Sequence, residues 1–249
     1  MIILKSPREI NIMRKANQIV AKTHEYLKDI IEPGISTAEI NEKGDEFIRE
    51  HGAEPSFKGY RGFPASICVS INDEVVHGIP NSQRILQEGD IVSLDIGTFY
   101  KGFNGDAART FAVGEISEEA QKLLNVTREA LDEGIKKALH KNHLSDISHA
   151  IQSYVEKNDF SVVREYVGHG IGTDMHEAPQ IPNFGSPGHG PVLKEGMTLA
   201  IEPMVNIGDF KVKTLDDNWT VVTEDGSLSA HFEHTIAITK KGPKILSKL

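Results

Sequence analysis

The chain has 249 residues, of which 39% are hydrophobic and 25% are charged, and its formal net charge is −9 at pH 7. This length and composition predict a globular protein with one sizeable core or two fused halves. The negative charge and the absence of a basic stripe argue against general nucleic-acid binding. Cys68 is the single cysteine, which excludes an internal disulfide, and the first residues lack a signal-peptide pattern. We therefore expect a cytoplasmic protein without a membrane-spanning helix.

Two helices are expected near the amino terminus. Residues 6–9 (SPRE) combine an N-cap serine, a proline in the first turn and a glutamate three residues after the cap. Apolar residues at helical spacing follow until Pro33-Gly34. Residues 36–39 (STAE) repeat the capping pattern and predict a second helix that ends at Gly52. A strand is expected over Ile67–Ile71 in the loop-rich part that follows.

Residues 91–111 (IVSLDIGTFYKGFNGDAARTF) predict a strand, a tight turn at Tyr100–Lys101 and a returning strand. In a hairpin closed by that turn Asp95 would lie opposite Asp106, with Cβ atoms roughly 5 Å apart. Two carboxylates this close repel each other, so one must be protonated unless a cation lies between them. The alternative is that one aspartate caps a turn and the other is solvated.

The order of expected elements then repeats. Helices are predicted over Ser117–Leu139 and Ser145–Asp159, followed by loops and by an apolar strand that ends at Glu202. Residues 194–202 (KEGMTLAIE) match residues 87–95 (QEGDIVSLD) in a Glu-Gly pair and in an acid at the end of the strand. We therefore predict two related halves, about residues 6–113 and 117–239, whose pseudo-twofold would bring Asp95 and Glu202 to a shared centre.

The closing part of the chain is rich in strand formers. Strands are predicted over Lys211–Thr214, Trp219–Thr223 and 230–239 (AHFEHTIAIT). Alternation along the last strand would place Glu233 on one face with His231 and Thr235.

Four carboxylates and an imidazole form the candidate site. They are Asp95, Asp106, Glu202, Glu233 and a histidine of the glycine-flanked stretch 168–177 (GHGIGTDMHE). This hard, oxygen-rich set suits two adjacent divalent ions better than one structural zinc. Cations bridged by carboxylates remove the repulsion within such a cluster, and two-metal centres, which include those of aminopeptidases, activate water for hydrolysis.

Other catalytic motifs fail on inspection. Residues 168–173 (GHGIGT) lack the third glycine of a dinucleotide-binding loop. His176-Glu177 and 231–234 (HFEH) do not have the spacing of a helical zinc-protease motif, and no P-loop or Gly-x-Ser-x-Gly elbow occurs.

Several stretches occur together in a characteristic order along the chain. They are residues 70–80 (SINDEVVHGIP), the Asp95 and Asp106 pair, 168–172 (GHGIG), 175–177 (MHE), 201–203 (IEP) and 232–235 (FEHT). Together they resemble the type I methionine aminopeptidases of the compact bacterial kind. The resemblance implies an α+β pita-bread fold, in which two pseudo-twofold-related halves of helices pack on a curved antiparallel sheet. It also implies a single catalytic domain over residues 1–249.

The resemblance implies a set of site residues as well. The metal ligands would be Asp95, Asp106, His169, Glu202 and Glu233, holding two divalent ions (Co, Mn, Fe or Zn). Glu202 would handle the proton, His176 would stabilise the oxyanion and His77 would hydrogen-bond the scissile amide. Together with these two histidines, the substrate-binding residues would be Tyr60, Phe63, Cys68, Met175 and Trp219, an apolar pocket for methionine.

The activity implied is removal of the initiator methionine from nascent proteins and peptides whose second residue is small. A proline-specific peptidase of the same fold is the nearest alternative, and a binding protein that kept the fold without catalysis is another. A dinuclear phosphatase is disfavoured because it would want more imidazoles at the metals. The expected partners are nascent polypeptides with N-terminal methionine, with transient ribosome contact; we expect no nucleic-acid recognition, no membrane and a monomer.

Overall fold

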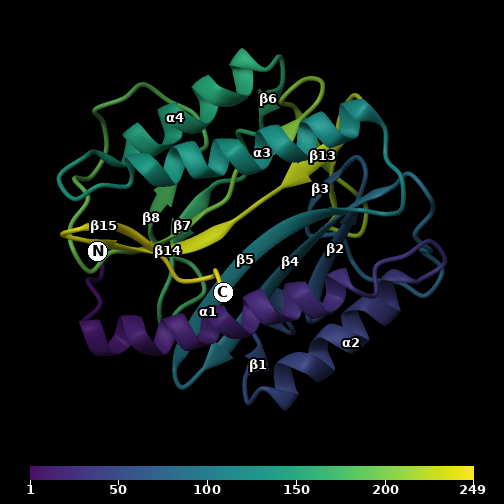
Figure 1. Ribbon diagram of the computed structural model, residues 1–249, viewed down its shortest axis with the longest axis horizontal. Helices are drawn as coiled ribbons and strands as arrows, with labels where there is room; N and C mark the ends of the chain where they lie inside the picture. Colours follow the sequence, from purple (N-terminus) through teal and green to yellow (C-terminus); the bar gives the residue numbers. More distant parts are fainter.

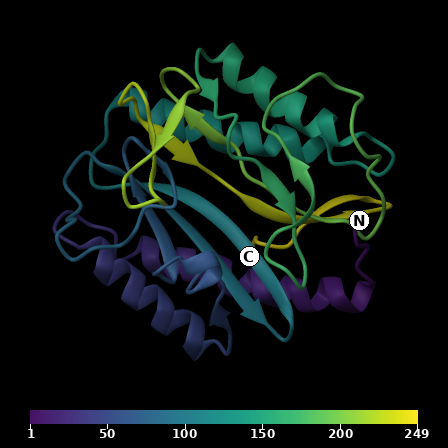
Figure 2. The same ribbon diagram turned by 180° about the vertical axis from the view of Figure 1, so that it is seen from behind.

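The chain has four α-helices. They lie above and below the strands in the view of Figure 1. The computed structural model describes residues 1–249. α1 (Pro7–Lys28) and α2 (Thr37–Glu50) pack beside strands of the first part of the chain, and α3 (Glu118–Lys137) and α4 (Leu144–Lys157) beside strands of the second. Figure 2 shows from behind that the two helix pairs lie on opposite sides of the strands. This is the α+β arrangement that the sequence predicts.

The strands form four antiparallel sheets. Their orders are β1-β4-β2 with β5 on β4, β13-β10-β6, β11-β12-β3 and β15-β14-β9-β7-β8. The short 3-10 helix η1 covers Tyr60–Gly62, and the strands are β1 (Glu54–Pro55), β2 (Ile67–Ile71), β3 (Glu74–Val76), β4 (Ile91–Tyr100), β5 (Phe103–Ala112), β6 (Ser161–Val162), β7 (Gly168–Gly170), β8 (Glu177–Ile181), β9 (Thr198–Ile201), β10 (Met204–Asn206), β11 (Val212–Thr214), β12 (Val221–Thr223), β13 (Ser229–His231), β14 (His234–Thr239) and β15 (Gly242–Ile245).

The first two helices begin where the capping signals place them. The Glu9 carboxylate accepts a hydrogen bond from the Ser6 backbone N–H at 2.7 Å, which completes the predicted capping box of α1. Ser36 caps α2 by accepting from the Glu39 N–H at 3.1 Å. The first residue of α4 differs from the prediction, because Asp146 accepts from the His143 N–H at 2.9 Å and the helix starts at Leu144.

The turn of the β4–β5 hairpin lies one residue later than predicted. Lys101 and Gly102 form a two-residue loop with φ of 49° and 87°, which is the geometry of a type I′ turn. Asp95 is therefore paired with Ala108, and Gly97 with Asp106, so the predicted Asp95–Asp106 pairing is wrong by two residues. A two-residue shift preserves the face, so the two carboxylates are diagonal neighbours on one side of the hairpin.

The predicted strand over residues 230–239 is interrupted. β13 ends at His231 and pairs with β10, whereas β14 starts at His234 and pairs with β9. Glu233 lies in the break, and its backbone N–H donates to the Ala108 carbonyl of β5 at 2.9 Å. Glu233 therefore does not follow the alternation of a continuous strand, because it occupies a junction between sheets. Asp95 also differs from the prediction in lying within β4 rather than at its end.

Each helix pair has its own apolar core. The larger cluster joins α3 and α4 to β9, β13 and β14 and contains the fully buried Leu123 and Ile147. The second cluster joins α1 and α2 to β2 and β4 and contains Leu27, Ile40 and Leu94. Full burial of each such side chain contributes about 1.5–3 kcal/mol. The two cores hold the strands of the first and second parts of the chain on either side of the cleft described below.

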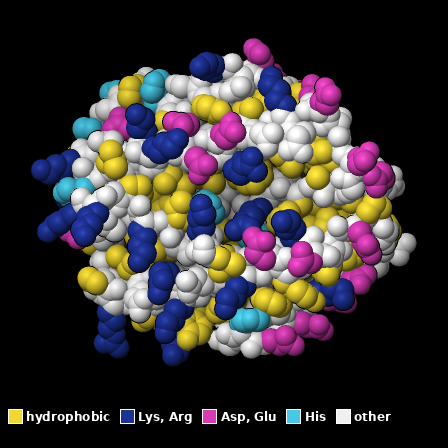
Figure 3. Space-filling model, in the orientation of Figure 1, with side chains coloured by type: hydrophobic (Ala, Val, Ile, Leu, Met, Phe, Trp, Pro, Cys, Tyr) yellow, Lys and Arg dark blue, Asp and Glu magenta, His cyan; other side chains and the backbone are white.

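The surface charge is uneven on the face seen in Figure 3, with Lys and Arg gathered towards the end where α1 begins and α3 ends. α3 starts with Glu118 and Glu119 and finishes with Lys136 and Lys137. These charges complement the helix dipole at both ends. None of the helices has both the length and the apolar character needed to cross a bilayer.

Candidate metal centre and substrate cleft

A cleft of about 280 Å³ gathers most of the predicted site residues. Its walls include Tyr60, Phe63, Cys68, His77, Asp95, Asp106, His169, His176, Glu202, Trp219 and Glu233. Met175 is the one predicted residue that does not line it. This side chain is 3% exposed and packs behind the wall with Phe63 and Cys68.

Three residues from distant parts of the chain meet at the base of the cleft. Asp106 of β5, His169 of β7 and Glu233 of the β13–β14 break offer ligand atoms that all lie within 4.8 Å of one another. The His169 Nε2 atom is 3.7 Å from Asp106 Oδ2 and 3.5 Å from Glu202 Oε1. Asp95 lies outside this tight group but lines the same cleft.

The glycines beside His169 allow its strand to approach its neighbours closely. A Cβ atom on Gly168 would lie 2.4 Å from the Ala200 carbonyl oxygen, and one on Gly170 would lie 2.3 Å from that of Ala178. The His169 Nδ1–H donates to the Gly170 carbonyl at 2.9 Å, which leaves Nε2 as the free nitrogen facing the carboxylates. The Gly-His-Gly stretch therefore both admits the histidine and fixes its tautomer.

Burial dominates the electrostatics of this group. It raises the pKa of Asp106, Glu202 and Glu233 well above the usual range, and the charges of neighbouring carboxylates raise it further. Burial lowers the pKa of His169 to about 3. Oxygens of Asp95, Asp106 and Glu233 are buried without a hydrogen-bond partner. Unpaired buried carboxylate oxygens beside a neutral imidazole fit a divalent cation, which would supply the missing positive charge.

His176 is held by its neighbours on two sides. Its Nδ1 atom is 2.8 Å from the Tyr60 hydroxyl, and its ring stacks on that of Tyr60 with centroids 5.3 Å apart. The other neighbour is His169, 4.2 Å away between ring centroids. Next along the chain, Glu177 forms a buried ion pair with Lys5. The Glu177 side chain is 5% exposed and the Lys5 side chain 4%. The segment that carries His176 is therefore fixed to η1 and to the amino-terminal residues.

His77 lies in a loop with unusual backbone geometry. Its φ is 61°, a region that residues other than glycine seldom occupy. The ring meets Tyr166 and Trp219 edge-on, with centroids 5.6 Å and 6.1 Å apart. Burial lowers the pKa of His77 to about 4, so the imidazole is neutral near pH 7.

An apolar pocket adjoins the carboxylates. Phe63 and Trp219 meet at right angles with ring centroids 5.1 Å apart, and Cys68 on β2 pairs with Asp95 on β4. Gly97 leaves room for this packing, because a Cβ atom there would lie 2.4 Å from the methyl group of Met175. The pocket could hold a flexible thioether beside the carboxylate cluster.

His231 is a residue of this site to which the sequence analysis gave no role. It is 1% exposed, its Nε2 atom is 3.7 Å from Glu202 Oε2, and neither ring nitrogen has a hydrogen-bond partner. Its position two residues before Glu233 could have drawn attention to it. Arg61, Glu165 and Tyr166 also line the cleft, and no local pattern in the sequence indicates them.

Buried carboxylates and an imidazole gathered in a cleft of an α+β fold are typical of metallohydrolases. The sequence profile of metallopeptidase family M24 matches residues 11–240. The chain is 61% identical to methionine aminopeptidase 1 of Bacillus subtilis over 249 residues, with 100% of each covered. It superposes on the crystal structure of methionine aminopeptidase from Thermotoga maritima with a TM-score of 0.99, at 49% identity and full coverage of both chains. The chain therefore belongs to the methionine aminopeptidases of metallopeptidase family M24.

More distant relatives share the fold but are longer. An Xaa-Pro dipeptidase from Bacillus anthracis superposes with a TM-score of 0.79 at 26% identity, covering 99% of this chain and 62% of that one. The predicted pita-bread fold is thus confirmed, and membership of the family implies that the chain uses a divalent metal.

Proposed function

We propose that this chain removes N-terminal methionine from polypeptides whose second residue is small. The observation that carries the proposal is the group of buried carboxylates with unpartnered oxygens around His169, beside an apolar pocket of aromatic rings. Two divalent ions, of Co, Mn, Fe or Zn, would be held there by Asp95, Asp106, His169, Glu202 and Glu233. The names of the relatives that match the whole chain support the choice of methionine.

Glu202, His176 and His77 each have a proposed role in hydrolysis of the first peptide bond. Bound divalent ions supply Lewis acidity and make a water molecule easier to deprotonate. Glu202 takes the proton as the water oxygen attacks the carbonyl carbon, and it returns a proton to the amine nitrogen when the C–N bond breaks. His176, with its Nδ1 atom at the Tyr60 hydroxyl, presents Nε2–H to the developing oxyanion. His77 hydrogen-bonds the scissile amide.

The methionine side chain would occupy the apolar pocket. Phe63, Cys68 and Trp219 form its walls, Tyr60 its edge, and Met175 supports it from behind. An unbranched thioether can adapt to such a surface and makes favourable contacts with aromatic rings. The neutral imidazoles of His77 and His176 close the polar side of the pocket, so both also contact the substrate.

We extend the proposal to the setting of the reaction. The substrates would be nascent polypeptides that begin with methionine, met by a monomeric enzyme in the cytoplasm through transient contact with the ribosome. Size-exclusion chromatography and cosedimentation with ribosomes test the last two points. A stable dimer or an absence of any ribosome-dependent sedimentation would contradict them.

A peptide panel tests the proposed activity. The chain is stripped of metal with a chelator, reloaded with Mn, Fe, Co or Zn, and assayed on Met-Ala-Ser, Met-Leu and X-Pro peptides. We expect free methionine from Met-Ala-Ser, little from Met-Leu and no cleavage of X-Pro. Cleavage of X-Pro alone would favour the proline-specific alternative. Intact Met-Ala-Ser with every metal, together with retained peptide binding, would support the non-catalytic alternative. The Glu202→Gln variant, which removes the proposed proton acceptor, is the inactive control and should show no turnover.

A further inference from the structure

The loop that carries His77 needs an external constraint. A positive φ at a residue other than glycine persists only where surrounding contacts enforce it, and such positions cluster at functional sites. His77 has a φ of 61° directly after β3. Its contacts with Tyr166 and Trp219 are edge-on ring contacts, which do not by themselves fix a backbone torsion. The restraint on this backbone torsion must therefore come from contacts at the two ends of the loop.

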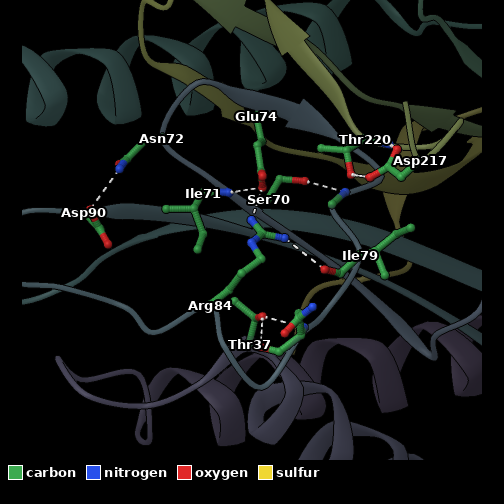
Figure 4. A network of polar contacts seen from close by, with 12 residues as sticks. Thr37, Ser70, Ile71, Asn72, Glu74, Ile79, Arg84, Asp90, Asp217 and Thr220 are labelled. Carbon is green, nitrogen blue, oxygen red and sulfur yellow. Dashed lines mark hydrogen bonds and ion pairs between the residues drawn. The ribbon is translucent and has the colours of Figure 1, made fainter. Parts of the chain in front are cut away.

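One guanidinium joins the residues on either side of His77. Arg84 forms an ion pair with Glu74, three residues before His77, and its Nη1–H donates to the Ile79 carbonyl, two residues after, at 2.9 Å. Figure 4 shows Arg84 between these two partners. We call Arg84 and its two partners, Glu74 and Ile79, the Arg84 clamp. The Glu74 carboxylate also accepts from the Ile71 N–H of β2 at 2.8 Å, so the clamp is bound to the sheet.

Gly78, the residue after His77, is held against β2 by its own backbone. Its N–H donates to the Ser70 hydroxyl at 3.1 Å, and its carbonyl accepts from the Val69 N–H at 2.9 Å. A Cβ atom at this position would lie 2.2 Å from the Val69 carbonyl oxygen, so the loop lies directly against β2. Together these contacts leave His77 as the residue that must absorb the change of direction.

Arg84 is itself anchored to the start of α2. Its carbonyl accepts from the Thr37 N–H at 2.9 Å, and the Thr37 hydroxyl donates to the Asn81 carbonyl at 3.0 Å. Arg84 thus connects the start of α2, through its backbone carbonyl, to both sides of the His77 loop, through its guanidinium. Arg84 does not line the cleft, so it can act on the reaction only through the residues that it holds.

We propose that Arg84 is a positioning residue for His77. It holds the loop in the positive-φ conformation and so directs the imidazole to the scissile amide. The proposal rests on the role of His77 in the proposed function. It predicts that loss of the clamp lowers kcat while leaving KM for the methionine pocket nearly unchanged, because misplacing a catalytic group by about 1 Å can cost up to ~10²-fold in rate.

The test is a set of variants assayed on the Mn-loaded chain with Met-Ala-Ser. Arg84→Gln should lower kcat about 10-fold to 100-fold, with KM changed less than about threefold. Arg84→Lys keeps the charge but cannot span both partners, and should retain an intermediate rate. Glu74→Gln removes the same ion pair and should resemble Arg84→Gln. Arg49→Gln is the matched control, because Arg49 pairs with Asp45 within α2, 2.6 Å apart, and should match wild type.

A double-variant cycle separates positioning from general destabilisation. In the His77→Ala background, Arg84→Gln should cause no further loss of kcat, because the group that it positions is gone. A further loss of similar size in that background would overturn the proposal and indicate a structural role. If Arg84→Gln does not fold, the Arg84→Lys and Glu74→Gln variants carry the same comparison.

The outcomes also distinguish this inference from the proposed function. A wild-type kcat for His77→Ala would contradict the catalytic role of His77 and with it both proposals for this residue. A strong effect of His77→Ala combined with a wild-type kcat for Arg84→Gln would overturn the positioning role alone.

Discussion

Two carboxylates of the cleft, Asp95 and Asp106, and two of its histidines, His77 and His176, are held in different ways. Asp95 and Asp106 lie within the long β4–β5 hairpin, where the backbone ladder fixes them. His77 and His176 lie on segments without such a ladder and depend on other side chains, Arg84 for one and Tyr60 for the other. The difference indicates that metal binding and catalytic geometry can be disturbed separately. Variants of the two groups test whether metal binding and catalytic geometry can be lost independently or only together.

The largest loss of activity is expected from a change to Asp95 or Asp106, the carboxylates held by the β4–β5 backbone. Asp106→Asn should lower activity by more than ~10²-fold, because loss even of outer contacts to a metal site costs about 10–100-fold. The variant should also lose the rise in Tm that divalent metal gives the wild type, since an ion that binds only the folded state stabilises it. Activity assays and thermal melts with and without Mn measure both effects. An unchanged metal-dependent shift in Tm would remove Asp106 from the ligand set.

Variants of His176 and of its partner Tyr60 should have a lower kcat but should still bind metal. His176→Ala should lower kcat by ~10²–10³, the usual cost of removing one oxyanion donor. Tyr60→Phe keeps the ring but not the hydroxyl that fixes the His176 tautomer, and should lower kcat about tenfold. Metal content and KM should stay near wild type in both. Tyr26→Phe, a stacked tyrosine on α1, is the control. Equal losses of metal and rate in Tyr60→Phe would contradict the separation.

A buried ion pair supports the His176 segment through stability. Lys5→Met leaves the Glu177 carboxylate buried without its partner, which typically costs about 3–5 kcal/mol of unfolding free energy. Lys43→Met, which removes an exposed pair with Glu39, should cost less than about 1 kcal/mol. Urea denaturation compares the two. Similar midpoints for both variants would show that the buried pair contributes little.

The smallest effect concerns His24, which lies away from the cleft on α1. Its pKa is lowered to about 3, mainly by burial and also by the positive charge of Arg109. His234 and His231 lower this pKa to a smaller extent. The unfolded chain binds a proton at this residue below about pH 6.5, so its contribution to stability is complete above that pH and is lost as the pH falls towards 3. Between pH 6.5 and 5 the loss is about 2 kcal/mol. His24→Gln should flatten this part of the pH dependence of unfolding free energy, and an unchanged slope would contradict it.

The sequence predicts the elements that local signals define. Ser6 and Ser36 mark helix starts because a side chain satisfies the first free backbone N–H groups, and the structure confirms both. The acid after β9, Glu202, also lies where the strand pattern places it. Such features depend on a few neighbouring residues, so they can be read without the rest of the chain.

What the sequence does not predict depends on long-range contacts. The hairpin turns at Lys101-Gly102, although lysine is not a usual residue for a positive φ. The observed strand register therefore differs by two residues from the predicted one. The break at Phe232-Glu233 arises because β13 and β14 pair with different strands. The clamp of Arg84 on Glu74 and Ile79 depends on how a loop folds back, which no local pattern specifies.

The central claim is that the buried carboxylates coexist because divalent cations lie among them. Anomalous diffraction from crystals grown with Mn tests this most directly. We expect two peaks roughly 3.5–4 Å apart, both within bonding distance of side chains from the set Asp95, Asp106, His169, Glu202 and Glu233. Crystals with ample Mn but no peak in the cleft, and with these side chains pointing apart, would contradict it.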